Sequence, residues 1–297
     1  LSHMVSTLVG GPGYGFIDGT SADARFPRPL DITTDGISLF VADTRNNAIR
    51  KIDISTGAVT TLAGNGSAGA SDGAGASASF NFPHGITTDG TNLYITDQDS
   101  STIRKVKIST GAVTTLAGSP GITGSIDGTG TAARFNRPSG ITTDGTHLYV
   151  ADSENATIRK IDIGTGIVTT LAGSGGLGWD DGTGTAASFW WPSGITTDGT
   201  SLYVTDDGNH LIRKVIISTG VVTTYAGSRG VAGSADGTGT AAMFSTPRGI
   251  TTDGTNLYVV DLGNNTIRQI VITTGEVSTI AGSAGSTGFV DGTGSAA

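Results

Sequence analysis

The chain has 297 residues and a formal net charge of -8, because 17 lysines and arginines stand against 25 aspartates and glutamates. This balance argues against a nucleic-acid-binding protein, which neutralises phosphates with clustered lysine and arginine. No apolar run approaches the roughly 18 residues needed to span a bilayer, so membrane insertion is not expected. The 48 glycines exclude a helical protein, and the absence of cysteine excludes disulfides and thiolate sites.

The predicted elements begin with a single strand. Residues 1–4 are interpreted as the remnant of an expression tag, and a natural signal peptide is not expected in this sequence. A Val-Ser-Thr segment that recurs later in the chain begins at Val5 and predicts a strand over residues 5–9.

Five nearly identical units follow this strand. The phrase Ile-Thr-Thr-Asp-Gly recurs at steps of 54 or 55 residues, beginning at Ile32, Ile86, Ile141, Ile195 and Ile250. An Ile-Arg pair follows in each unit, and a Val-Thr-Thr or Val-Ser-Thr segment closes each one. Such a period indicates a repeat architecture in which neighbouring units cover one another's apolar faces.

Each unit predicts four short strands separated by turns. In the second unit these are residues 85–88, 93–97, 103–108 and 113–116, with a hairpin turn at Asp89-Gly90 and a glycine-rich connector after the last strand. We therefore predict an all-β fold, a β-propeller of four-stranded antiparallel blades spanning residues 5–297 as one domain. Five blades are favoured. Six remain the alternative if another chain or a longer parent protein completes the fold.

The surplus strand at residues 5–9 has two interpretations. It competes with residues 277–280 for one outer sheet edge, or it indicates a fragment cut from a longer protein. The protein is accordingly expected to be a monomer or to assemble through this strand.

The fourth unit carries the triplet Asn209-His210-Leu211 within the run from Gly194 to Arg213. This run resembles the NHL-repeat family, and the resemblance extends in phase over nearly the whole chain. It implies a β-propeller, usually of six blades, that most often serves as a binding platform. The chain departs from that pattern by having five complete units.

Several repeated residues are predicted to be structural. Each unit ends its second strand with an aspartate and places an arginine among aliphatic residues of its third strand, and a buried arginine requires a carboxylate. The predicted structural ion pairs join Asp43 with Arg50, Asp97 with Arg104, Asp152 with Arg159, Asp206 with Arg213, and Asp261 with Arg268. The phenylalanines that recur at one phase of the connector are predicted to fill space between blades; they are Phe26, Phe80, Phe135, Phe189 and Phe244. The Asp-Gly pairs of the connectors are interpreted as turns, because a calcium site needs more acidic ligands than they supply.

The sequence offers little material for catalysis. The three histidines beyond the first residues, His84, His147 and His210, fall at three different phases of the unit, so they predict no metal site on the propeller axis. No Gly-x-Ser-x-Gly elbow accompanies the many serines. No cofactor and no catalytic residue are predicted.

Variation between the units concentrates in the connections that precede the first strand and follow the second. Binding groups concentrate on variable loops carried by a rigid scaffold. The candidate ligand-binding residues are Arg28, Phe82, His84, Arg137, Trp190, Trp191, Asp207 and Arg248. The adjacent tryptophans are either interface anchors or packing residues between blades four and three.

The favoured function is a non-enzymatic scaffold that presents this variable loop face to a protein or a glycan. The Thr/Gly/Ser-rich, lysine-poor composition places it outside a bacterial cytoplasm, either extracellular or at the cell surface. One alternative is a metal-dependent lyase or hydrolase with its metal on the propeller axis. Another is an engineered or excised repeat propeller with no ligand.

Overall fold

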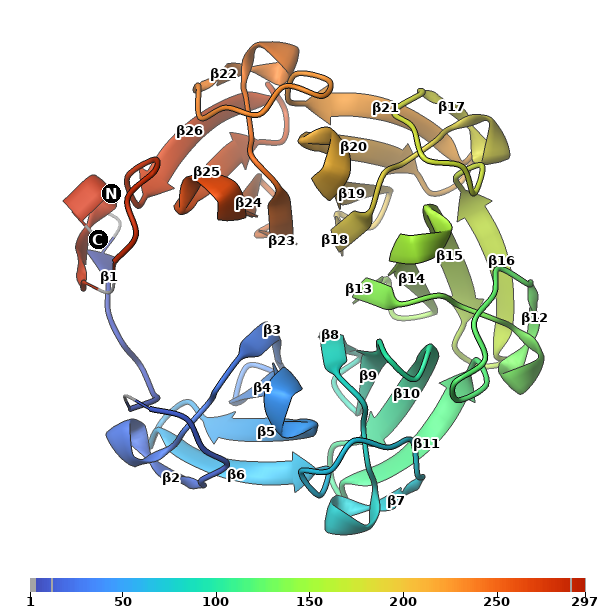
Figure 1. The fold of residues 1–297 in the computed structure, drawn as a ribbon, viewed down its shortest axis with the longest axis vertical. Helices are drawn as coiled ribbons and strands as arrows, with labels where there is room; N and C mark the ends of the chain where they lie inside the picture. The colour runs from blue at the N-terminus through green and yellow to red at the C-terminus, as the bar shows by residue number, and fades with distance from the viewer. Residues whose placement is uncertain (1–3, 12, 289, 297) are drawn as a thin grey trace. The chain divides into compact units, whose positions relative to one another are not determined.

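The computed structural model describes residues 4–11, 13–288 and 290–296, which form short β-strands and single-turn 3-10 helices (Figure 1). Twenty-five of the strands form five antiparallel sheets of five strands each, which we call blades 1 to 5. The fold is thus all-β, a five-bladed β-propeller, as the sequence predicted. Within the described part of the chain, no helix is long and apolar enough to cross a membrane.

The blades follow one another along the chain. Blade 1 contains β2 (Gly19–Thr20), β3 (Pro29–Thr34), β4 (Ser38–Asp43), β5 (Ala48–Asp53) and β6 (Ala58–Ala63). Blade 2 contains β7 (Gly73–Ala74), β8 (Pro83–Thr88), β9 (Asn92–Asp97), β10 (Thr102–Lys107) and β11 (Ala112–Ala117). Blade 3 contains β12 (Gly128–Thr129), β13 (Pro138–Thr143), β14 (His147–Asp152), β15 (Thr157–Asp162) and β16 (Ile167–Ala172).

The last two blades repeat this order. Blade 4 contains β17 (Gly182–Thr183), β18 (Pro192–Thr197), β19 (Ser201–Asp206), β20 (Leu211–Ile216) and β21 (Val221–Ala226). Blade 5 contains β22 (Gly237–Thr238), β23 (Pro247–Thr252), β24 (Asn256–Asp261), β25 (Thr266–Val271) and β26 (Glu276–Ala281). Two further strands, β1 (Met4–Val5) and β27 (Gly292–Thr293), pair with each other.

Single-turn 3-10 helices occupy the connections. One set follows each two-residue strand of a blade: η1 (Ser21–Asp23), η3 (Gly75–Ser77), η4 (Gly130–Ala132), η6 (Gly184–Ala186) and η8 (Gly239–Ala241), with η10 (Gly294–Ala296) after β27. A second set follows the second long strand: η2 (Thr44–Asn46), η5 (Ser153–Asn155), η7 (Asp207–Asn209) and η9 (Leu262–Asn264).

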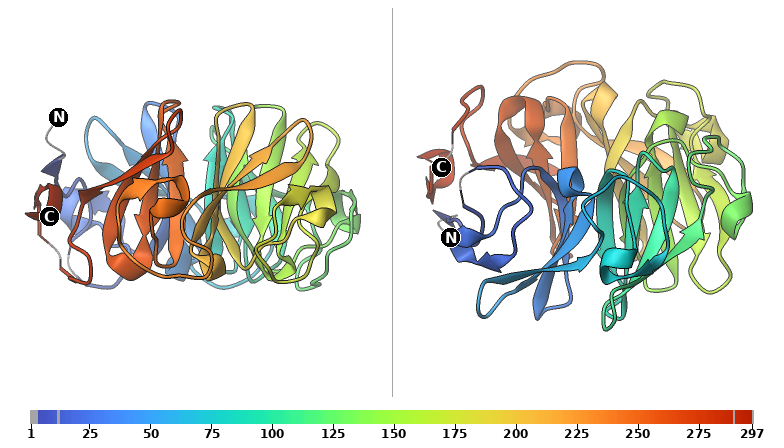
Figure 2. Two further views of the ribbon diagram at one scale, coloured as in Figure 1. Left: turned by 90° about the horizontal axis from the view of Figure 1, so that it is seen from above. Right: turned by 60° about the horizontal axis from the view of Figure 1, so that its bottom comes forward.

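The blades have five strands rather than the four predicted. The additional strand is a two-residue segment of the preceding connector, such as β7, whose Gly73 lies opposite Val113 of β11. It therefore sits at one edge of the sheet, and the strand that begins at the proline sits at the other (Figure 1). The long strands of each blade run antiparallel to their neighbours (Figure 2). Two residues are too short to produce an alternating pattern, so these strands leave no periodic signal in the sequence.

The expected competition between residues 5–9 and residues 277–280 does not occur. β26 pairs with β22 and β25 inside blade 5, whereas β1 pairs with β27. The prediction of a shared outer edge was wrong because the connector strand β22 already covers two residues of that edge.

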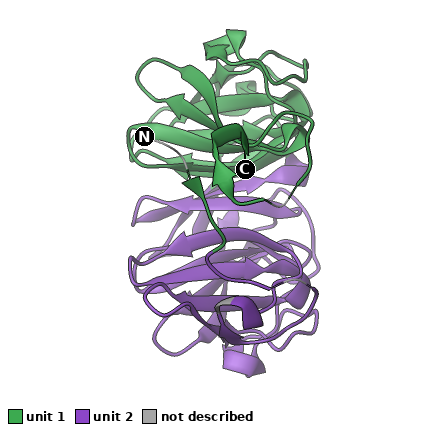
Figure 3. Ribbon diagram, turned by 90° about the vertical axis from the view of Figure 1, so that its left-hand side faces the viewer, with its two compact units in different colours: residues 1–7, 156–159, 170–297 green, residues 8–155, 160–169 purple. Residues whose placement is uncertain are grey.

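The chain divides into two compact units (Figure 3). Unit 2 comprises residues 8–155 and 160–169, with blades 1 and 2 and most of blade 3. Unit 1 comprises residues 1–7, 156–159 and 170–297, with blades 4 and 5 and the β1–β27 pair.

The first turn of each blade explains why the Asp-Gly phrase is invariant. In blade 2, Asp89 Oδ1 accepts hydrogen bonds from the backbone N–H groups of Thr91 and Asn92 at 2.8 and 2.7 Å. Gly90 has a φ of 84°, which favours glycine. The aspartate side chain thus closes the turn, and the glycine completes it without strain.

The apolar core of each unit lies between neighbouring blades. Phe40 and Ile49 of blade 1 pack with Leu93 and Ile95 of blade 2 around the connector residue Phe80, which is fully buried. Phe135 lies in the same way between blades 2 and 3, and Phe244 lies between blades 4 and 5. The prediction that the repeated phenylalanines fill space between blades is confirmed at these three positions.

Candidate functional site

A buried arginine anchors the interior of each blade. In blade 4, Arg213 has no exposed side-chain surface, and its Nη1 donates to Asp206 Oδ2 at 2.9 Å. Its guanidinium lies over the ring of Phe189, 5.1 Å from the centroid. The predicted pairs of the other blades in contact, at 2.8–3.1 Å, are Asp43 with Arg50, Asp97 with Arg104, and Asp261 with Arg268. Asp152 and Arg159 of blade 3 are both fully buried.

The connector aspartates, interpreted from sequence as simple turn residues, are the second carboxylate of this network. In blade 4, Arg213 Nη2 donates to Asp181 Oδ1 at 3.0 Å, and Thr224 Oγ1 donates to the same oxygen. The same contact recurs at 2.7–2.9 Å between Asp18 and Arg50 and between Asp72 and Arg104. The turn interpretation was therefore incomplete. The missed signal was the constant spacing between this aspartate and the arginine, which lies about 32 residues later in each unit.

Arg268 of blade 5 shows that the predicted ion pairs were incomplete, because each prediction named only one carboxylate. The sequence assigned Arg268 one carboxylate, but the structure gives it two, with Nη1 at 2.9 Å from Asp261 and Nη2 at 2.8 Å from Asp236. The same two nitrogens donate to the backbone oxygens of Met243 and Ala235 at 2.8 and 3.0 Å. Arg268 is fully buried and therefore lies away from the solvent that a ligand would occupy. It joins a long strand to the connector of its blade, not only one strand to the next.

The network also holds the segment that leads into the first long strand. Asp206 Oδ1 accepts the backbone N–H of Trp190 at 2.7 Å, and Asp206 Oδ2 accepts Asn209 Nδ2 at 2.8 Å. Equivalent backbone bonds join Asp97 to Asn81, Asp152 to Asn136 and Asp261 to Ser245 at 2.7–2.8 Å. Burial raises the pKa of Asp206 to about 6, while Arg213, Asn209 and the Trp190 N–H act in the opposite direction. Blades 2 to 5 therefore fix the backbone beside their most variable residue. In blade 1 the corresponding position is Pro27, which has no N–H to donate.

That variable residue adopts a rare backbone conformation in four blades. Phe82, Arg137, Trp191 and Thr246 each precede a proline and have φ angles of 63°, 52°, 55° and 48°. Left-handed backbone is uncommon for residues other than glycine, and for a β-branched residue such as Thr246 it is an outlier. Strained backbone of this kind persists only where the surroundings impose it and is concentrated at functional sites.

We call the end of a blade that carries these residues and the turn after the second long strand its loop end. In blade 4 the two parts are joined by backbone bonds from Asp207 N to Trp191 O and from Gly208 N to Trp190 O. In blade 2 the corresponding bonds run from Gln98 and Asp99 to Phe82 and Asn81.

In unit 2, neighbouring loop ends contact one another through the predicted site residues. The guanidinium of Arg28 lies 5.9 Å from the ring centroid of Phe82. Arg137 Nη2 donates to Gln98 Oε1 at 3.2 Å and pairs with Asp99 Oδ1 at 3.2 Å. His84 lies beside Ser139, with Nδ1 and Nε2 at 3.3 and 3.5 Å from the hydroxyl oxygen. The structure thus brings Arg28, Phe82, His84 and Arg137 to adjacent loop ends.

Unit 1 brings the remaining predicted residues together. Arg248 Nε of blade 5 pairs with Asp207 Oδ2 of blade 4 at 3.0 Å. Burial raises the pKa of Asp207, and Arg248 acts in the opposite direction. Beside this pair the backbone N–H of Thr246 donates to His210 Nδ1 at 3.0 Å.

The adjacent tryptophans have different surroundings. Their rings lie 5.9 Å apart at 52° to each other. Trp190 is half-buried against Gly208, where a Cβ atom would come within 2.6 Å of the indole ring. Trp191 is 48% exposed. Trp190 therefore packs on the turn of its own blade, and Trp191 is exposed to solvent at the loop end of blade 4.

Asp31 is a loop-end residue that the sequence reasoning missed. It stands where the other units have Gly85, Gly140, Gly194 and Gly249. Its carboxylate accepts the backbone N–H groups of Ile86 and Ile32 at 2.8 and 2.9 Å, so it links the first long strands of blades 1 and 2. Burial raises its pKa to about 6, against the effect of both hydrogen bonds. The signal available in the sequence was this single departure from glycine.

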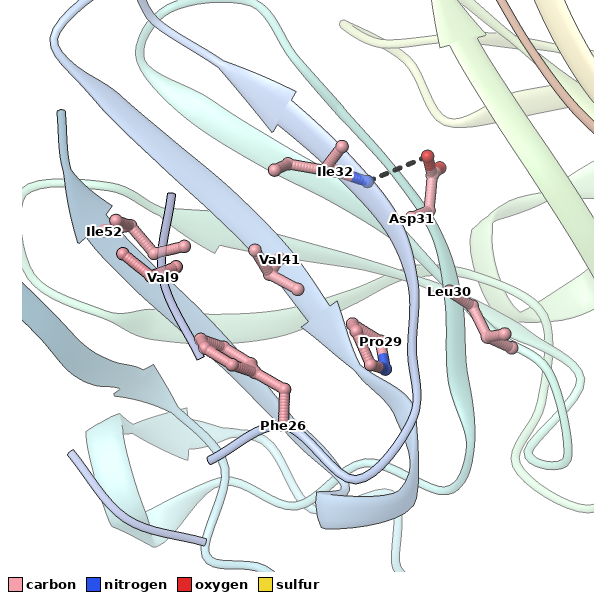
Figure 4. A pocket seen from close by; sticks show the side chains of 8 residues that line it. All are labelled: Val9, Phe26, Pro29, Leu30, Asp31, Ile32, Val41 and Ile52. Carbon is pink, nitrogen blue, oxygen red and sulfur yellow. Dashed lines mark hydrogen bonds between the residues drawn. The ribbon is translucent and has the colours of Figure 1, made fainter. Parts of the chain in front are cut away.

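A separate apolar cavity of about 290 Å³ lies on the face of blade 1 that points away from blade 2. Its lining includes Val9, Phe26, Val41 and Ile52. Asp31 also borders it, but its carboxylate turns away from these side chains (Figure 4). Ile32 on this face is 52% exposed, whereas Ile86 at the same position of blade 2 is 3% exposed.

A family model for the NHL repeat matches residues 135–161. Among curated proteins, the chain is 34% identical over 287 residues to Protein SUPPRESSOR OF QUENCHING 1, chloroplastic, of Arabidopsis thaliana, covering 90% of this chain and 27% of that protein. It is 29% identical to human NHL repeat-containing protein 2, covering 93% of this chain and 43% of that protein. The chain therefore spans less than half the length of these relatives.

Among solved structures, a protein of unknown function from Bacteroides thetaiotaomicron matches with a TM-score of 0.71 and 22% identity, covering 98% of this chain and 67% of that one. At that identity the likeness concerns the fold alone.

The extracellular or cell-surface location expected from composition is wrong, because the curated relatives are a chloroplastic plant protein and NHL repeat-containing proteins of vertebrates. Composition misled because glycine, serine and threonine fill the turns and connectors of this repeat wherever the protein resides. The chain thus contains an NHL repeat at residues 135–161, is similar to NHL repeat-containing proteins and folds as a five-bladed β-propeller.

Proposed function

We propose that this protein is a non-enzymatic binding module that recognises a protein partner through its loop ends. The main supporting observation is that the residue before the proline has a left-handed backbone conformation in four blades. In blades 2 to 5 its backbone follows a residue that a buried aspartate holds by the same hydrogen bond, while its side chain differs between Phe82, Arg137, Trp191 and Thr246. A fixed backbone that displays different side chains is what a recognition surface requires, since ordering costs are met before the partner binds.

The side chains at the loop ends favour a peptide with acidic and apolar groups. Arg137 and Arg248 are each about half exposed, at 50% and 47% of the side chain. Exposed tryptophan and arginine are the residue types most often found at the energetic centres of protein interfaces. The arginines also stand out on a chain of net charge -8, so they favour acidic partners locally.

The geometry of the Ser139–His84 contact supports the non-enzymatic part of the proposal. A general base directs one nitrogen lone pair at the hydroxyl that it activates. The hydroxyl oxygen of Ser139 lies at nearly equal distances from both ring nitrogens of His84. Neither lone pair is therefore directed at it, and the contact serves to pack two loop ends together.

A phage-displayed random-peptide library panned against the full chain tests the proposal. We expect enriched peptides with acidic and apolar residues, whose binding falls at least tenfold with Trp191→Ala. Trp179→Ala is the matched control, because Trp179 is 45% exposed but lies in the connector before β17. Enriched peptides that bind equally to both variants, or a library that yields none while a glycan array gives Trp191-dependent binding, would refute a peptide-binding loop end.

A further inference from the structure

The β1–β27 pair has the register of the outer edge of a blade. Val5 lies opposite Gly292, and Met4 lies opposite Thr293. In every blade the glycine of the two-residue strand lies opposite a valine of the last long strand: Gly19/Val59, Gly73/Val113, Gly128/Val168, Gly182/Val222 and Gly237/Val277. The register of β27 therefore corresponds to that of the two-residue edge strand of a blade, and the register of β1 corresponds to that of the last long strand. The described residues contain no counterparts of the three other strands for this pair.

Asp291 repeats the role of the connector aspartates in part. The backbone N–H and the hydroxyl of Thr7 donate to its two carboxylate oxygens at 3.2 and 3.3 Å. Thr61 makes the same two contacts with Asp18 in blade 1, where Arg50 of the third long strand also reaches Asp18 at 2.7 Å. The contacts of Asp291 with Thr7 leave the arginine position of this arrangement open.

The face of blade 5 that carries Val260, next to β1, is partly exposed, whereas the corresponding face of blades 1 and 4 is buried. Val260 of blade 5 is 41% exposed, whereas its counterparts Ala42 and Thr205 are fully buried. A cavity of about 340 Å³ lies there, lined by Val260, Ile267, Ala281, Val5 and Asp291 among others. In blade 1 the matching face is covered by a phenylalanine, Phe80, together with Ile86, Leu93 and Ile95 from the long strands of blade 2.

We propose that this surface of unit 1 binds a three-stranded antiparallel segment of another polypeptide that has the pattern of the inner strands of this repeat. The segment pairs its third strand with the free edge of β1, as in strand-addition complexes. It places a phenylalanine and aliphatic side chains on Val260 and Ile267, and its third strand brings an arginine to Asp291. The requirement for arginine follows from Asp291, and the requirement for apolar residues follows from the exposed face of blade 5.

The experiment co-expresses the full chain with a tagged peptide that has the sequence of residues 79–111. These residues contain Phe80, the three long strands β8, β9 and β10, and Arg104. We expect a one-to-one complex by native mass spectrometry. Val260→Asp in the chain abolishes it, and Asp291→Asn or Arg104→Met in the peptide weakens it by about tenfold or more, since each removes a charge-assisted hydrogen bond.

Val231→Asp is the matched control for Val260→Asp, because Val231 is 46% exposed and lies in the connector before β22. It should leave the complex intact, and circular dichroism of each variant checks that the chain folds. Absence of a complex with a soluble peptide overturns the proposal. So does a complex that is insensitive to both Val260→Asp and Asp291→Asn. A dimer of the unmodified chain that Val260→Asp dissociates would assign the surface to a second copy and overturn it as well.

Discussion

Arg104 and Arg137 are both paired with aspartates of unit 2, but their surroundings differ completely. Arg104 is fully buried, contacts Asp97 and Asp72, and lies over the ring of Phe80 at 5.2 Å. Half of the Arg137 side chain is exposed, and it pairs with Asp99 at the loop ends. The first kind of pair recurs from blade to blade, and the second does not. Burial thus separates residues that define the repeat from residues that are free to diversify.

The largest expected effect on stability comes from removing the buried arginine of an aspartate–arginine pair. Arg104→Met leaves Asp97 and Asp72 without their shared cation and should lower the free energy of unfolding by about 3–5 kcal/mol, because an unpaired buried carboxylate is costly. Urea unfolding followed by fluorescence measures this. Arg137→Met is the control and should change stability by about 1 kcal/mol or less, as expected for an exposed ion pair. Equal effects would contradict the distinction between the two kinds of pair.

A smaller effect is expected where the fixed turn of blade 4 contacts the loop-end aromatic. Gly208→Ala places a Cβ atom 2.6 Å from the Trp190 ring, so the ring must move, at a cost of about 1–3 kcal/mol. The fluorescence spectrum of the folded variant should shift with it. Gly176→Ala is the control, since its nearest contact is an ordinary 3.6 Å. An unchanged midpoint of unfolding for Gly208→Ala would show that Trp190 packs loosely.

Asp31 gives a pH-dependent prediction. Burial raises its pKa in the folded protein from 3.8 to about 6, so the folded state holds the proton more tightly than the unfolded state. Its contribution to stability is fully present below pH 4 and is lost as pH rises from about 4 to about 6. Relative to Asp31→Asn, the protein should therefore lose about 1–3 kcal/mol over this range. Unfolding curves at pH 4, 5, 6 and 7 test this, and a constant difference between the two proteins would contradict it.

The smallest effect concerns the exposed pair of unit 1. Arg248→Ala should change stability by at most about 1 kcal/mol, and raising the ionic strength should reduce the difference because salt screens exposed charges. The measurement is the unfolding midpoint at low and high salt. A loss as large as that of Arg104→Met would place Arg248 among the structural residues and remove it from the candidate site.

The sequence predicted most of the architecture because the repeat displays its own constraints. Strand alternation together with an in-phase Asp97 and Arg104 located both the long strands and the buried pairs. It did not reveal β7, since that strand has two residues and pairs with β11, nearly forty residues later. It also assigned the connector aspartates to turns alone, because only the folded chain brings Asp72 to Arg104 and Asp236 to Arg268.

Prediction of the candidate site had the same limit. The positions of Phe82, Arg137 and Trp191 followed from comparing units, but their left-handed backbone depends on hydrogen bonds across the loop end. Asp31 was overlooked because its importance comes from the N–H of Ile86 in the next blade. The separation of Trp190 from Trp191 likewise depends on the space above Gly208, which no pattern in the sequence specifies.

The two-residue strands have a consequence for the protein's behaviour in concentrated solution. Threonine- and valine-rich strands such as β11 and β21 would expose unpaired amide and carbonyl groups along a flat edge, and such edges promote aggregation between molecules. In each blade the short strand of the preceding connector, such as β7 or β17, pairs with part of the edge of the last long strand. By covering this edge, the glycine-rich connectors prevent β-sheet pairing between molecules. Shortening them should make the protein prone to form fibrils.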